Sequence, residues 1–194
     1  VVKSLLGTSP LSSLPYVLSL ISPFTFGQTT FAVNMVFVVF ELLMLRRDFP
    51  AVFWLQIPVT ILFGFCIDFF MNLFTIVPDA YALKLLLCLL GTALVALGVA
   101  GQGIADVLML AGEGAVYTFA HQFHIDFGKV KVGNDISLVI LAAIVSVLTM
   151  GTIEGIREGT LISALLTGII ARFYLRHLSR IDAHGRIYLA PHKS

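Results

Sequence analysis

The chain has 194 residues, of which 58% are hydrophobic and 12% are charged, and its formal net charge is +1. Soluble domains carry about 25% charged residues, so this composition excludes an ordinary soluble domain, and the balanced charge gives no reason to expect a nucleic-acid partner. Apolar runs of roughly 20 residues recur without the alternation of barrel strands. They predict an all-α, polytopic helical membrane protein whose main partner is the lipid bilayer.

The first apolar segment, residues 8–22, is too short and too rich in Ser and Pro to cross a bilayer. Ser9 followed by Pro10 is a good helix start, because Ser caps the helix and Pro suits its first turn. We therefore expect a short interfacial or re-entrant helix here. The chain begins with Val1, and its first residues read like the end of a longer segment, so we also expect a helix before it.

Five longer apolar segments predict membrane spans, or six with the expected N-terminal helix. They cover about residues 28–45, 50–74, 80–100, 135–150 and 160–178. Pro58 predicts a kink inside the second span, because it lacks an N–H and its ring disturbs the helix. Cys66 and Cys88 lie within apolar runs, and we interpret them as small buried residues rather than as a disulfide.

Residues 101–133 interrupt this apolar pattern with seven ionisable side chains. Lys and Arg favour the cytoplasmic side of a membrane, which places the turn at Arg46 and Arg47 and the basic tail, residues 179–194, in the cytoplasm. If residues 101–133 enter and leave on one side, Lys129 and Lys131 are cytoplasmic as well. We therefore predict a re-entrant segment, and a multi-pass protein of the bacterial inner membrane with a cytoplasmic C-terminus.

The membrane domain, residues 1–178, divides into two similar halves, approximately 1–78 and 79–178. Gly7 and Gly27 bracket the first short helix at nearly the spacing at which Gly112 and Gly133 bracket a second one. With Gly64 placed over Gly168, the final spans also align. A unit with an odd number of crossings must sit opposite to its copy, which predicts the inverted repeat common among secondary transporters.

Several segments resemble the YczE/YyaS/YitT family of bacterial integral membrane proteins. They are GTSPLSSLP (7–15), LRRDFP (45–50), LQIPVTILFGFCIDFFMNL (55–73), LLLCLLGTALVALGVA (85–100) and REGTLISALLTG (157–168). The resemblance implies a multi-span protein of the bacterial inner membrane that is suspected of transport. The second half departs from the pattern, because Gly112-Glu113-Gly114 stands where a Gly-Ser-Pro-like turn is expected.

Ionisable residues in membrane segments default to functional hypotheses. Asp106 and Glu113 are seven residues apart and share a helix face, where they either bind a cation, proton or amine or lie solvated at helix ends. His121, His124 and Asp126 suggest a proton relay or half a metal site, but no third strong ligand is spaced to complete it. We therefore predict neither a metal nor a cofactor.

Two further polar groups complete the predicted substrate-binding set. Arg157 and Glu158 precede the last span, where free backbone N–H groups suit a carboxylate or phosphate, although a solvated helix end is the simpler interpretation. Asn34 and Gln56 lie within spans, where such residues bind a solute or join helices. We interpret Glu41 as a local partner of Arg46.

The sequence carries no catalytic motif, so we do not expect an enzyme. The best-supported expectation is a secondary transporter of a small polar or anionic solute, with ion or proton coupling and a possible homodimeric assembly. Two alternatives stay open: a substrate-binding membrane subunit of a multi-component transporter like the energy-coupling-factor systems, and a non-transport protein that assists another membrane assembly.

Overall fold

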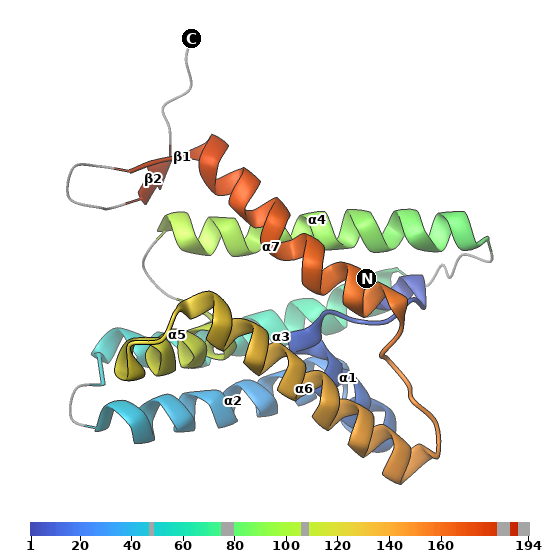
Figure 1. Cartoon of the computed structure of the whole chain (residues 1–194). Helices are drawn as coiled ribbons and strands as arrows, with labels where there is room; N and C mark the ends of the chain where they lie inside the picture. The colour runs from blue at the N-terminus through green and yellow to red at the C-terminus, as the bar shows by residue number, and fades with distance from the viewer. Residues whose placement is uncertain (47–48, 75–79, 106–108, 182–186, 190–194) are drawn as a thin grey trace.

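The computed structural model describes residues 1–46, 49–74, 80–105, 109–181 and 187–189 (Figure 1). The elements are η1 (Val2–Ser4), α1 (Pro10–Ile21), α2 (Phe26–Leu45), η3 (Ala51–Leu55), α3 (Gln56–Leu73), α4 (Tyr81–Ala105), α5 (Ala111–Phe123), α6 (Phe127–Met150), α7 (Glu158–Leu178), β1 (Ser179–Ile181) and β2 (Ile187–Leu189). The fold is helical, as predicted, apart from an antiparallel β1–β2 hairpin in the tail that sequence reasoning missed.

Four stretches of the described chain are long and apolar enough to cross a membrane: Phe26–Leu45, Ala51–Leu73, Tyr81–Gln102 and Phe127–Met150. Helix α7, the fifth predicted span, has 21 residues, and its part Glu158–Ala171 is an apolar helix. These helices expose large hydrophobic side chains outward, as membrane helices do. The prediction of a polytopic helical membrane protein is confirmed.

The two short helices that interrupt the spans are α1, with 12 residues, and α5, with 13. Helix α1 begins where predicted, with Ser9 at the N-cap position and Pro10 in its first turn, but the Ser9 side chain makes no capping hydrogen bond. Their N-terminal ends meet, since a Cβ added to Gly112 would lie 2.9 Å from a methyl carbon of Leu11. The first turns of two non-spanning helices therefore face each other between the spans.

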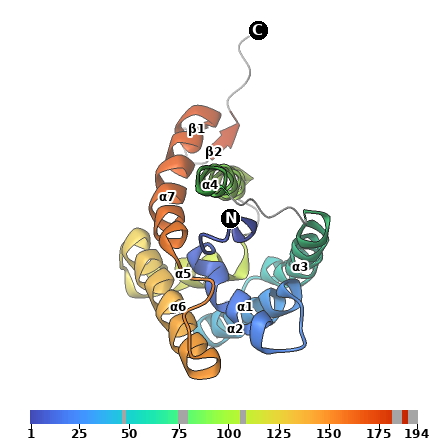
Figure 2. The same ribbon diagram turned by 90° about the vertical axis from the view of Figure 1, so that its right-hand side faces the viewer.

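The spans of the two halves run in opposite directions. In Figure 1, α2 and α6 point opposite ways, and so do α3 and α7. Helix α1 packs on α6 and helix α5 packs on α2, so each half places its short helix against the span that follows the short helix of the other half. Viewed along α4, the helices surround the N-terminal segment (Figure 2). This reciprocal packing is the arrangement of an inverted repeat.

Two predicted boundaries are corrected. Span α6 begins at Phe127 rather than near residue 135, because Asp126 caps it by accepting a hydrogen bond from the Lys129 N–H at 3.1 Å. Gly133 therefore lies inside α6 and is not the counterpart of Gly27. The counterpart is Gly128, since α2 and α6 each start with a capping residue followed by Phe-Gly.

The second apolar segment has no kink in its middle at Pro58. It changes instead from the 3₁₀ helix η3 to the α-helix α3 at Gln56. Pro58 then falls in the first turn of α3, where a missing N–H leaves no helix hydrogen bond unmade. The proline marks the start of a helix rather than a break within one.

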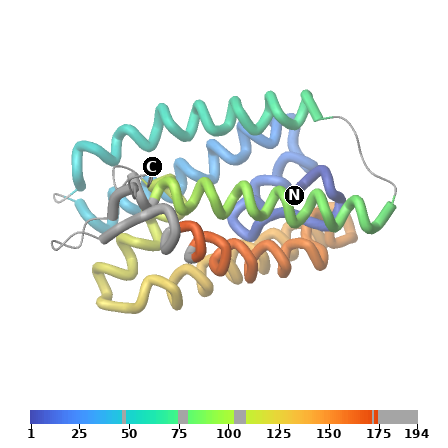
Figure 3. Tube along the Cα trace, turned by 90° about the horizontal axis from the view of Figure 1, so that it is seen from above, coloured from blue at the N-terminus to red at the C-terminus, as the bar shows by residue number. Residues whose placement is uncertain are grey.

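Helices α2 and α3 form a closely packed hairpin that is fastened at one end by Asp68. Its carboxylate accepts hydrogen bonds from the Gly27 N–H at 2.7 Å and from the Thr25 hydroxyl at 2.5 Å. The backbones cross where Gly27 faces Gly64, since a Cβ on Gly64 would lie 2.8 Å from the Gly27 carbonyl oxygen. In the other half, α7 packs instead on α4 (Figure 3).

Candidate functional site

A cluster of buried polar side chains lies where α2, α3 and α5 meet. Glu41 on α2 has 0% of its surface exposed, and Gln56 and Thr60 on α3 have 1% and 0%. Gln56 and Thr60 are one helical turn apart and share a face of α3. We refer to Glu41, Gln56 and Thr60 as the Glu41 cluster.

Helix α5 covers the Glu41 cluster through Gly114, which lies near the start of that helix. A Cβ at this position would overlap the Glu41 carboxylate and would lie 3.1 Å from the Gln56 amide nitrogen. The glycine therefore lets the backbone of α5 approach both side chains. The carboxylate also lies near the N-terminal end of α5, where the helix dipole favours negative charge.

The Glu41 cluster is not satisfied internally. Both carboxylate oxygens of Glu41, the Gln56 carbonyl oxygen and the Thr60 hydroxyl are buried without a well-formed hydrogen bond among the described residues. The nearest donor to the carboxylate is the amide nitrogen of Gln56, which lies beside it. An ionised carboxylate in such surroundings is costly unless a cation or proton neutralises it. The cluster is therefore built to take up a positive charge.

The predicted pairing of Glu41 with Arg46 is wrong. Arg46 ends α2 with a φ of 47° and is exposed, whereas Glu41 faces the interior of the bundle. The only ion pair among the described residues is Lys131–Asp135. Local spacing suggested a surface pair, but the packing of α3 and α5 against this face of α2 buries the acid alone.

Of the predicted site residues within spans, only Gln56 belongs to the cluster. Asn34 is buried on α2, but its amide donates to the Thr30 carbonyl oxygen at 2.8 Å, one turn earlier. That bond serves the helix rather than a ligand. Asp106 lies outside the described residues.

Glu113 lies in the first turn of α5 but faces a different group of side chains. Burial raises the pKa of its carboxyl group, the positive charge of Lys131 opposes that rise, and the negative charge of Asp135 adds to it. Lys131 and Asp135 pair with each other on α6 at 2.9 Å. Glu113 therefore belongs to the α5–α6 contact and not to the Glu41 cluster.

The histidines of the predicted relay or metal half-site serve the turn between α5 and α6. His121 is exposed in the last turn of α5, with its ring stacked 6.2 Å from that of Tyr117. His124 ends the helix in the left-handed conformation, with a φ of 55°. Since Asp126 caps α6, the HxxHxD pattern is accounted for by helix termini.

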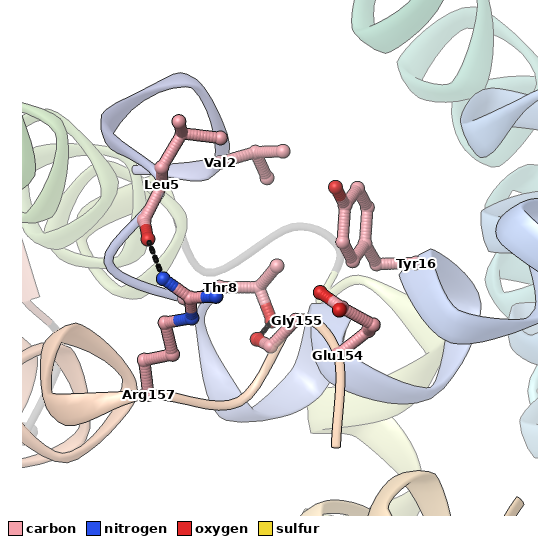
Figure 4. A pocket seen from close by; sticks show the side chains of 8 residues that line it. Val2, Leu5, Thr8, Tyr16, Glu154, Gly155 and Arg157 are labelled. Carbon is pink, nitrogen blue, oxygen red and sulfur yellow. Dashed lines mark hydrogen bonds between the residues drawn. The ribbon is translucent and has the colours of Figure 1, made fainter. Parts of the chain in front are cut away.

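Arg157 lies in a second polar site, at the connector between α6 and α7. It lines a cavity of about 100 Å³ together with Tyr16, Glu154 and Thr8 (Figure 4). Burial raises the pKa of the Tyr16 phenol, and the nearby Glu154 carboxylate raises it further. Glu158 is exposed at the start of α7 and does not line the cavity.

Sequence reasoning thus found one member of each polar site and missed the residues around it. Glu41 carried a usable signal, since it is the only acid in an otherwise apolar span. Thr60 and Gly114 gave none, because a threonine or glycine acquires a role only when another helix packs against it. Tyr16 and Glu154 come from opposite halves of the repeat.

Comparison with known proteins places the chain in a family without assigning it an activity. No curated protein and no solved structure matches it. One family model, described as a family of unknown function, matches residues 1–176, which is nearly the whole chain. The chain therefore belongs to the DUF6198 family.

Proposed function

We propose that this protein is a secondary transporter of a small polar solute and that the Glu41 cluster couples transport to a proton. The observation that carries the proposal is the fully buried, unpartnered carboxylate of Glu41, beside the similarly unpartnered oxygens of Gln56 and Thr60. Intramembrane acids of this kind mark proton relays in pumps and transporters.

The inverted packing of the two halves supports a mechanism of alternating access. In such folds one half rocks against the other around a site at their interface. Glu41 lies on the first half and Gly114 on the second, so a relative movement of the halves would separate them. The carboxylate would then meet water and release its proton, and closure would restore the dry site in which it is neutral.

The resemblance to YczE/YyaS/YitT proteins supports the finer assignment to the bacterial inner membrane. A cytoplasmic position for the C-terminus follows from the distribution of Lys and Arg. Under this assignment, the end of the bundle that carries Arg46 and Lys129 faces the cytoplasm. The Glu41 cluster lies near that end.

The proposal is tested by a thermal-shift screen of the purified protein against organic anions, zwitterions and polyols at pH 5.5 and pH 8. A solute at 100 times its Kd stabilises the folded protein by about 2.7 kcal/mol. We expect at least one solute to stabilise the wild type, with an affinity that differs between the two pH values.

The decisive variant is Glu41→Gln, which keeps the shape of the side chain but cannot release a proton. We expect it to bind the same solute with no dependence on pH. Glu158→Gln, which changes an exposed acid, is the matched control and should behave like the wild type. The proposal fails if no solute stabilises the protein, or if Glu41→Gln keeps the wild-type pH dependence.

A further inference from the structure

The cavity beside Arg157 is lined by segments that are far apart in the sequence and is partly open. The loop before α1 forms one side of it, Tyr16 on α1 another, and residues 154–157 of the connector to α7 the third (Figure 4). Its volume of about 100 Å³ is well below the roughly 300–1,000 Å³ of pockets for drug-sized ligands. It therefore suits a ligand of only a few non-hydrogen atoms.

The cavity holds one positive and one negative side chain that do not neutralise each other. The Arg157 guanidinium makes a single long hydrogen bond, 3.5 Å, to the Leu5 carbonyl oxygen. It forms no ion pair with Glu154, since Lys131–Asp135 is the one ion pair in the described part of the chain. Figure 4 shows the two charged groups on either side of Thr8 and Gly155.

The backbone between the two charges is held in place by several bonds. The Thr8 N–H donates to the Gly155 carbonyl oxygen at 3.0 Å and to the Thr160 hydroxyl at 3.2 Å. The Thr8 hydroxyl donates to the same Gly155 oxygen at 3.2 Å. Gly155 has a φ of 73°, and a Cβ there would lie 2.5 Å from the Tyr16 ring. The backbone between the two charged residues is therefore fixed by the fold, whereas the Arg157 side chain is exposed at the rim of the cavity.

We propose that this cavity binds a small zwitterion that carries both a carboxylate and an ammonium group. Arg157 would take the carboxylate through its planar pair of N–H donors. Glu154 would pair with the ammonium group, with the face of the Tyr16 ring beside it. The inference rests on the proposed function only in supposing that the bound zwitterion is the solute carried.

A ligand with a single charge fits the cavity less well. A simple anion would satisfy Arg157 but would meet the Glu154 carboxylate in the same small space. A simple amine would satisfy Glu154 but would be repelled by Arg157. Only a molecule with both charges leaves neither side chain unpaired, so the site is expected to reject acetate and methylamine.

The test measures binding of glycine and β-alanine to the purified protein by calorimetry, with acetate and methylamine as singly charged analogues. We expect at least one zwitterion to bind at least tenfold more tightly than either analogue. Arg157→Gln and Glu154→Gln should each weaken that binding at least tenfold. Arg157→Lys, which keeps the charge but loses the paired donors, should weaken it less than Arg157→Gln.

Glu158→Gln is the matched control, because Glu158 neighbours Arg157 in sequence but does not line the cavity, and it should bind like the wild type. The inference is overturned if neither zwitterion binds, if an analogue binds equally well, or if Glu154→Gln binds normally while eluting as a folded protein.

The two proposals can fail separately. If neither zwitterion binds but another solute stabilises the protein in a Glu41-dependent way, the proposed function stands and this site fails. If the zwitterion binds but Glu41→Gln keeps the pH dependence of that binding, the site stands and the coupling fails.

Discussion

Glu41 combines complete burial with two unpaired carboxylate oxygens, a combination that destabilises a folded protein. Its neighbours Gln56 and Thr60 each offer an unpaired oxygen that can accept a hydrogen bond. An amide in place of the carboxyl group would supply two N–H donors in the same space. The acid is therefore expected to make the folded protein less stable than an amide at the same position would.

This cost predicts that Glu41→Gln stabilises the protein. Satisfying buried polar groups is worth about 1–3 kcal/mol, so the thermal midpoint in detergent should rise by several degrees. Gln56→Leu should not mimic this gain, because it leaves the carboxylate unpaired. A midpoint for Glu41→Gln below that of the wild type would show that Glu41 has a partner that the substitution removes.

Glu113 predicts a dependence of stability on pH. Its pKa is raised in the folded protein by burial, so the folded state binds its proton more tightly than the unfolded state. The stability this contributes is present at low pH and is lost as pH rises through the raised pKa. Thermal midpoints between pH 4 and pH 8 should therefore fall less steeply in Glu113→Gln than in the wild type.

The charged neighbours of Glu113 on α6, Lys131 and Asp135, provide the control for this prediction. Lys131→Met removes the positive charge that opposes the rise in pKa, so the loss of stability with rising pH should be larger and should extend to a higher pH. If Glu113→Gln keeps the wild-type profile, another group is responsible for the pH dependence.

At the scale of single residues, the sequence shows which side chains are polar, but it does not show which of them are buried or paired. Gln56 was predicted because it is polar within an apolar segment, and the structure buries it. Glu41 has the same signal, yet an arginine at a nearby position offered a simpler surface explanation. Whether a side chain is paired depends on which helices pack over it, and that information is spread over three distant segments.

At the scale of helices, the repeat predicts that equivalent glycines have unequal importance. Gly64→Ala would place a Cβ 2.8 Å from the Gly27 carbonyl oxygen, and such overpacking costs about 1–3 kcal/mol. Gly168→Ala meets nothing within 4 Å and should be neutral or slightly stabilising. Unfolding midpoints of the two variants measure the difference. Equal effects would mean that α2 and α3 do not cross at Gly64.

The start of a helix could be predicted where two adjacent residues mark it, and it was missed where neighbouring residues suggested a different feature. Ser9-Pro10 was recognised because a cap followed by proline is a strong signal. The start of α6 was missed because Gly133-Asn134 looked like a turn, whereas the actual cap, Asp126, stood in a pattern that suggested metal binding. Pro58 was placed in the correct helix, but its effect depends on its distance from a boundary that the apolar run conceals.

At the scale of the molecule, the inverted arrangement predicts which loops share a side of the membrane. The end of α2 and the start of α6 lie at one end of the bundle, and the connector from α6 to α7 lies at the other (Figure 1). In a chain whose two native cysteines are replaced by alanine, Arg46→Cys and Lys129→Cys should be labelled by an impermeant thiol reagent only after the cells are permeabilised. Ile153→Cys should be labelled in intact cells.

Labelling of Lys129→Cys in intact cells would place α5 across the membrane and would remove the basis of the inverted repeat. The helical membrane architecture could be predicted because the length of apolar segments is a global signal, whereas the orientation inferred from Lys and Arg stays a prediction. The contacts of α1 with α6 and of α5 with α2 could not be predicted, because they join segments on opposite sides of the repeat and leave no periodic trace in the sequence.

The fastening of α2 to α3 by Asp68 has a mechanical consequence. With Asp68 bonded to Gly27 and Thr25 at one end, and the Gly27–Gly64 crossing near it, these two helices would turn as a single lever. If the two helices move as one rigid unit, the backbone changes that accompany the movement fall on the loops before α2 and after α3.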